Sequence, residues 1–131
     1  NSKAWIRGVA EIIVIRSMPI SIYVGEQKVG EFHAQDWQFE MDSTIFDLEE
    51  GSKKLQGVAV NKILSNIETT SPYSTVLFSS ADTTFSCDLV EITRDDSIRI
   101  FIDINGYQMK YLLGTVQGKV FITNIERIQV Q

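Results

Sequence analysis

The stretch from Ser97 to Leu113 reads Ser-Ile-Arg-Ile-Phe-Ile-Asp-Ile-Asn-Gly-Tyr-Gln-Met-Lys-Tyr-Leu-Leu, and it carries the strongest fold signal in the chain. Asn105 and Gly106 both tolerate positive φ angles, which a two-residue type I′ turn requires, so the pair predicts a β-hairpin. The turn sets an expected register in which apolar side chains share one side of the hairpin, pairing Ile104 with Tyr107, Ile102 with Met109, Ile100 with Tyr111 and Ile98 with Leu113. We expect that side to face the core. The other side, which carries Arg99, is expected to be mostly exposed to solvent.

Further strands are expected on both sides of this hairpin. In the strand expected at 84–93 the apolar positions change parity near Leu89 and Val90, which predicts a bulge there. Regular spacing and short turns predict a mainly β fold, namely an antiparallel sandwich or partly closed barrel of about 8–10 strands built on hairpins. The other expected strands are Gly8–Arg16, Ile20–Val24, Val29–Phe32, Trp37–Met41, Thr75–Ser79 and Lys119–Val130, the last a candidate for the edge of a sheet.

The segment between residues 42 and 70 admits two interpretations. Apolar residues recur at helical spacing from Leu55 to Ile67, which predicts one helix near residues 52–66 in an otherwise β-rich chain. Gly51 and Gly57 oppose a helix, since each costs about 1 kcal/mol relative to Ala in a helix interior. The competing interpretation is a hairpin that pairs residues 44–48 with residues 54–60.

Length and composition limit the possible partners. The 131 residues, 44% of them hydrophobic and 22% charged, predict a single β-rich domain spanning residues 1–131. A formal net charge of −5 without a basic stripe argues against nucleic acid, and no apolar run is long enough for membrane insertion. The chain begins at Asn1 and has a single cysteine, so an upstream segment could have been removed and the sequence leaves the localisation undetermined.

Groups able to perform catalysis are scarce. His33 and Asp36 could form a pair, but no nucleophile is tied to them by spacing, so we expect no catalytic site and no enzymatic activity. Cys87 lies among apolar residues and is expected to be a buried, unreactive thiol. One His and one Cys do not make a zinc site, and the calcium-like start at Asp103 lacks the later acidic ligands, so no metal and no cofactor is expected.

Surface recognition remains as the expected role. Aromatic residues are concentrated in the first third of the chain, and a tryptophan flanked by polar residues could anchor a protein partner or stack on a sugar. The competing interpretation is that these rings simply fill the core. The candidate binding residues are Trp37, Asp36, Gln38, His33 and Tyr23.

Two classes of function follow from these observations. The first is a non-enzymatic protein-interaction module that acts through an aromatic patch or an exposed strand edge, such as an inhibitor or an adaptor, with another protein as partner in a hetero- or homo-oligomer. The second is a self-assembling structural subunit. Residues 54–125 are similar in expected strand order to the β-rich tube proteins of phage tails and type VI secretion, with which they share no diagnostic motif. A β-barrel that holds a small ligand is a third possibility.

Overall fold

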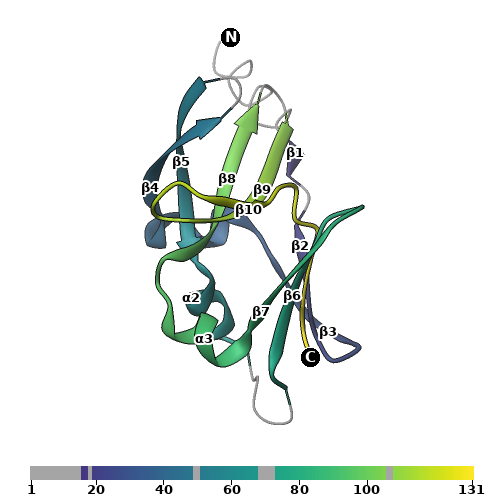
Figure 1. Cartoon of the computed structure of the whole chain (residues 1–131). Coiled ribbons are helices and arrows are strands. Elements are labelled where there is room, and N and C mark those ends of the chain that lie inside the picture. The colour runs from purple at the N-terminus through teal and green to yellow at the C-terminus, as the bar shows by residue number, and fades with distance from the viewer. Residues whose placement is uncertain (1–15, 18, 49–50, 68–72, 106–107) are drawn as a thin grey trace.

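Two β-sheets and three short helical segments make up the described part of the chain (Figure 1). The computed structural model describes residues 16–17, 19–48, 51–67, 73–105 and 108–131. The fold is mainly β, as predicted, with two sheets that are mostly antiparallel. The helical segments are η1 (Ala34–Glu40), α2 (Val60–Leu64) and α3 (Leu89–Arg94).

The first sheet has six strands in the order β1-β9-β8-β5-β4, with β10 also paired to β9. The second has five strands in the order β3-β2-β11-β6-β7. Figure 1 shows α2 and α3 at the lower end of the first sheet, between it and β7 of the second. The strands are β1 (Arg16–Ser17), β2 (Ile20–Val24), β3 (Gln27–Phe32), β4 (Asp42–Leu48), β5 (Gly51–Ala59), β6 (Thr75–Ser79), β7 (Thr84–Asp88), β8 (Ile98–Asn105), β9 (Gln108–Thr115), β10 (Val120–Ile122) and β11 (Arg127–Val130).

The hairpin predicted from the Asn-Gly pair forms, with a shifted register. Asn105 pairs with Gln108 and Ile102 with Tyr111, so the two strands are offset by two residues from the expected pairing. Residues 106 and 107, which connect them, lie outside the described residues. Because side chains alternate with a period of two, a two-residue offset keeps each residue on its expected side.

The prediction for the two faces of this hairpin is correct for one face and wrong for the other. Ile100, Tyr111 and Leu113 are buried in the main core between the two sheets, as predicted. The opposite side was expected to be mostly wet, yet Phe101 and Leu112 are buried there in a second core cluster. The reason is that the first sheet is curled, so its concave side encloses side chains of its own.

The curl shows in the distance between two strands that are not neighbours. In a flat sheet β4 and β9, three positions apart, would be roughly 14 Å from each other. A Cβ placed on Gly114 of β9 would instead lie 3.3 Å from Cε2 of Phe46 on β4. The first sheet is therefore a half-barrel, and its interior is filled by Phe46, Leu55, Phe101 and Leu112.

The helix expected near residues 52–66 is wrong over most of its length. Residues 51–59 form β5, paired with β4 from Leu48↔Gly51 to Asp42↔Gly57. The competing hairpin interpretation is therefore confirmed, although the second strand begins at Gly51 instead of residue 54 and ends before Val60. Only the end of the segment is helical, as α2. The helical spacing was misleading because Leu55 faces the half-barrel interior and Val58 faces the main core, so this strand buries apolar residues on both sides.

Three other expectations need correction. Residues 84–93 are not one bulged strand, since β7 ends at Asp88, whose carboxylate accepts hydrogen bonds from the N–H groups of Val90 and Glu91 and caps α3. The parity change therefore marks a strand-to-helix switch. Residues 119–130 form two strands in different sheets, and β11 lies in the centre of its sheet instead of at the edge.

The remaining correction concerns Trp37–Met41, which was expected to be a strand and is mostly η1. The hairpin of β2 and β3 and the strand β6 are confirmed. The strand expected at residues 8–16 lies outside the described residues apart from Arg16, which begins β1 and pairs in parallel with Gln108 of β9.

Candidate functional site

The segment η1 connects the two sheets and carries most of the predicted binding residues. It is a 3₁₀-helix of seven residues, longer than the three or four that are usual, so tertiary contacts must hold it. In a 3₁₀-helix residues three apart share a face, and Ala34 and Trp37 both face the protein. Ala34 is buried, and the Trp37 ring stacks on Phe32 at 6.3 Å between centroids. Asp36 N–H also donates to the His33 carbonyl at 3.0 Å.

Phe39 faces the opposite way. Its side chain is 92% exposed, more than any other large apolar residue in the described ranges. Glu40, the next residue along the chain, is exposed, and so is Asp36 on the same segment. The aromatic ring presented to solvent is therefore Phe39, whereas Trp37 packs inward on Phe32.

His33, at the N-terminal end of η1, contacts the edge strand β3. Its Nε2 lies 3.3 Å from Oε1 of Glu31, while Lys28 donates to Oε2 of the same carboxylate at 2.9 Å. The hydrogen bond from the Lys28 ammonium lowers the pKa of Glu31 and raises the pKa of Lys28. The side-chain partner of His33 is thus Glu31 and not Asp36, with which it shares only a backbone hydrogen bond.

Tyr23 pairs with Lys28 across β2 and β3 but lies away from η1. It lies on the outward side of β2, where the Arg127 guanidinium sits 4.0 Å from its ring centroid in a cation–π contact. Phe32, which leads into His33, pairs with Ile20, three residues away from Tyr23 along β2 and therefore about 10 Å along the strand. The side chain of Gln38 lies outside the described residues.

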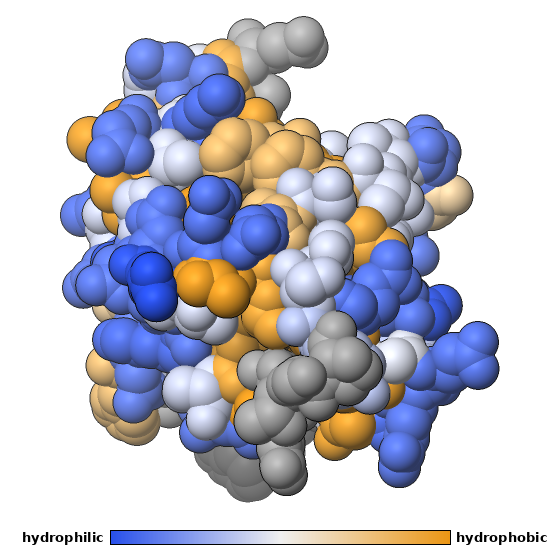
Figure 2. All heavy atoms as spheres, turned by 60° about the horizontal axis from the view of Figure 1, so that its bottom comes forward, coloured by the Kyte–Doolittle hydropathy of each residue, from blue (hydrophilic) through white to orange (hydrophobic). Residues whose placement is uncertain are grey.

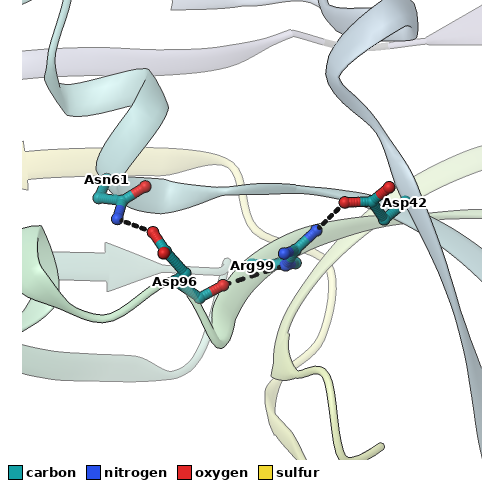
Figure 3. A network of polar contacts seen from close by, with 4 residues as sticks. All are labelled: Asp42, Asn61, Asp96 and Arg99. Atoms are coloured by element: carbon teal, nitrogen blue, oxygen red, sulfur yellow. Dashed lines mark hydrogen bonds and ion pairs between the residues drawn. The ribbon is translucent and has the colours of Figure 1, made fainter.

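A polar network beside α2 connects β4 with β8, two positions apart in the first sheet (Figure 3). Arg99 Nη1 lies 3.0 Å from an Asp42 carboxylate oxygen, and Arg99 Nε donates to the Asp96 carbonyl at 3.1 Å. Asn61 donates from its side-chain amide to the Asp96 carboxylate at 2.5 Å. Because these contacts tie β4, α2 and the α3–β8 connection together, we assign the network to stability.

The described residues offer little support for a reactive thiol, a metal site or a membrane-spanning helix. Burial, followed by repulsion from Glu91 and Asp95, raises the pKa of Cys87 to about 11, so its thiol is protonated at neutral pH. Within the described ranges, no three His, Cys, Asp or Glu side chains gather closely enough to hold a metal ion. Over those same ranges, none of the helices has the length and apolar character needed to cross a membrane.

One pocket lies beside β9, where the chain crosses between the sheets. Its volume is about 600 Å³, within the usual range for small-ligand sites. Tyr111 lines it, and the hydroxyl of Tyr111 is buried without a hydrogen-bond partner among the residues that the structure describes. Other lining residues include Pro19, Met109, Asn124 and Ile125.

Sequence reasoning found η1 but mistook its geometry. The composition Ala-Gln-Asp-Trp-Gln-Phe-Glu is poor in β-branched residues, and this signal could have argued against a strand. In a 3₁₀-helix, where residues three apart share a face, Trp37 and Phe39 would have been expected on different faces. No protein-family model matches the chain, and a search of curated proteins finds no significant relative. Arguments about function therefore rest on the side chains themselves.

Proposed function

We propose that this domain is a non-enzymatic protein-interaction module that contacts another protein through the surface of η1 around Phe39. The observation that carries the proposal is a phenylalanine 92% exposed on a segment whose inward residues are fixed against the core. Burying a phenylalanine side chain contributes about 1.5–3 kcal/mol. Because the segment is already held by Ala34 and Trp37, binding costs little ordering of the chain.

The charge around Phe39 favours a particular kind of partner. Asp36 and Glu40 are both exposed on η1, and the whole chain has a formal charge of −5. A partner with an apolar pocket and a basic rim would match this surface, and rim charges mainly raise the association rate. Binding should therefore weaken as the salt concentration rises.

A comparison of matched variants tests the proposal. The tagged domain and its Phe39→Ser and Ile45→Ser variants are used to capture proteins from cells that make the domain, and the affinity of any captured protein is then measured. Ile45 is the control because it is 67% exposed on β4. We expect Phe39→Ser to weaken binding at least tenfold, which corresponds to about 1.4 kcal/mol, and Ile45→Ser to leave it unchanged. Equal affinity of all three proteins would refute the proposal.

A small-ligand role is the second candidate, supported by the pocket lined by Tyr111. The pocket volume of about 600 Å³ suits a small molecule, and Met109 and Ile125 are among its lining residues. Screening small aromatic compounds by NMR would test this role, with shifts expected at Met109 and Ile125, and the absence of any compound that shifts both would count against it. Self-assembly into a ring or tube is the remaining alternative, and it is tested by the last experiment of the Discussion.

A further inference from the structure

Among the described residues, β7 is the edge strand of the second sheet, and some of its peptide groups point away from the sheet. Leu89 N–H donates to the Ser74 carbonyl and Ser80 N–H donates to the Thr83 carbonyl, both at 2.8 Å. These two bonds lie at the two ends of the regular pairing of β6 with β7. They establish which residues of β7 direct their peptide groups toward β6, since this direction alternates along the strand.

The alternation decides which peptide groups are free. Phe85 and Cys87 direct their N–H and C=O groups toward β6, whereas Thr84, Ser86 and Asp88 direct theirs away from the sheet. Among the described residues, no backbone hydrogen bond between elements uses these outward groups. The Asp88 carbonyl is at the N-cap position of α3, where it accepts the first bond of that helix, so the free groups are those of Thr84 and Ser86 and the N–H of Asp88. All three outward residues are exposed.

Other edges of the molecule are protected in ways that β7 is not. The opposite edge strand, β3, has an extra residue at Val29 where its register with β2 shifts, and its Lys28 and Glu31 form an ion pair. Such bulges and charges blunt an edge. On β4, a Cβ built on Gly118 would lie 3.0 Å from the Ile45 carbonyl oxygen, so the β9–β10 turn lies against that strand. The pairing of β7 is regular over five residues, without lysine or proline.

Apolar side chains adjoin the inward side of this edge. Phe85 stacks on Phe121 of β10, with 4.7 Å between ring centroids, and both rings remain partly exposed, as does Cys87. Val90, in the first turn of α3, is 53% exposed. Figure 2 shows an apolar strip in the middle of the lower face of the molecule, bordered by hydrophilic side chains.

We propose that the free edge of β7 is a second binding site, separate from the Phe39 surface, that takes up an extended segment of another protein in which apolar and basic residues alternate. Strand addition would satisfy the outward peptide groups, and the apolar residues of the added strand would cover Phe85 and Phe121. Its basic residues would face the polar side, where Asp82 and Asp88 lie at the two ends of the edge. The charge of −5 favours the same partner over a second copy of this chain.

A synthetic peptide of alternating valine and lysine, seven residues long, tests the site. Amide hydrogen exchange is followed by NMR with and without the peptide. We expect slower exchange at Thr84, Ser86 and Asp88 and unchanged exchange at Phe85 and Cys87, whose N–H groups already bond β6. A peptide N-methylated at alternate residues along one edge should not bind, because it lacks the donors. Equal binding of both peptides, or protection elsewhere only, would overturn the proposal.

Variants of Ser86 provide the matched comparison. Ser86→Pro removes an N–H that points away from β6, so the sheet is expected to fold, whereas Ser86→Thr keeps the donor. We expect Ser86→Pro to weaken peptide binding at least tenfold and Ser86→Thr to bind as the parent does. Phe39→Ser should bind the peptide normally, since that surface is separate. If the parent chain is instead a dimer that Ser86→Pro dissociates, the edge holds a second copy and the proposed partner is wrong.

Discussion

Replacement of Gly57 by alanine tests the packing on which the half-barrel depends. Gly57 pairs directly with Phe101 across β5 and β8. A Cβ on Gly57 would lie 2.5 Å from Cδ1 and 2.7 Å from Cε1 of the Phe101 ring. That ring is fully buried and meets Phe46 edge to face at 4.7 Å, so it has no free space to move into.

The expected cost follows from two opposing effects. Overpacking a core costs about 1–3 kcal/mol, and contacts this short place Gly57→Ala at the upper end. Alanine also reduces the backbone freedom of the unfolded chain, which stabilises the folded state by about 0.4–1 kcal/mol. We therefore expect Gly57→Ala to lower the free energy of unfolding by about 2 kcal/mol, which for a domain of this size lowers the melting temperature by roughly 8 °C.

Gly30→Ala is the matched control. Gly30 also lies in a strand, but a Cβ there would meet nothing within 4 Å, so only the entropic gain remains. Urea unfolding followed by far-ultraviolet circular dichroism gives both free energies of unfolding. Equal stabilities of Gly57→Ala and Gly30→Ala would show that Phe101 does not pack on Gly57, and the half-barrel would have to be rejected.

Further predictions concern single side chains. Asp88→Ala should cost about 1 kcal/mol in urea unfolding because the capping carboxylate of α3 is lost, and Asp88→Asn should recover most of it. Cys87, with its pKa raised to about 11, should react with a thiol reagent at pH 8 far more slowly than a cysteine in the urea-unfolded chain. Arg99→Met should lower the unfolding free energy by less than about 1 kcal/mol in the same urea assay, since it removes an ion pair with Asp42 whose carboxylate is exposed to solvent.

The pH dependence of stability has a defined sign for Asp95. Hydrogen bonds from the hydroxyl and N–H of Ser97 lower the pKa of Asp95. The stability that this residue contributes is therefore complete above its ordinary pKa and is lost as the pH falls through the lowered value. Asp95→Asn should flatten the loss of stability below about pH 4, as measured by thermal unfolding across pH. An unchanged acid profile would contradict this assignment.

Local signals predicted most strands, because turn residues and alternation act over a few residues. The Asn105-Gly106 pair predicted the hairpin, and its two-residue offset was harmless because alternation preserves the faces. The predictions that were wrong concern features that depend on contacts between residues far apart in the sequence. Nothing local in β5 reveals that Leu55 faces a half-barrel interior while Val58 faces the main core, so a strand buried on both sides resembled a helix.

The candidate site shows the same limit. The sequence located His33, Asp36 and Trp37 together because they are close along the chain, and η1 keeps them together. It placed Tyr23 with them on aromatic character alone, whereas the pairing of β2 with β3 puts Tyr23 opposite Lys28 and away from η1. The orientation of Phe39 depends on Trp37 packing against Phe32, a contact between elements that the sequence does not reveal.

Photo-crosslinking from position 39 inside the cell tests directly whether Phe39 contacts a protein partner. Phe39 is replaced by p-benzoylphenylalanine, which its exposure should tolerate, and the same replacement of Ile45 is the control. We expect, for position 39 only, a covalent adduct that contains a different polypeptide. An adduct of twice the chain's 14.8 kDa would indicate self-assembly, and adducts of equal yield from both positions, or none, would contradict the claim that Phe39 contacts a protein partner.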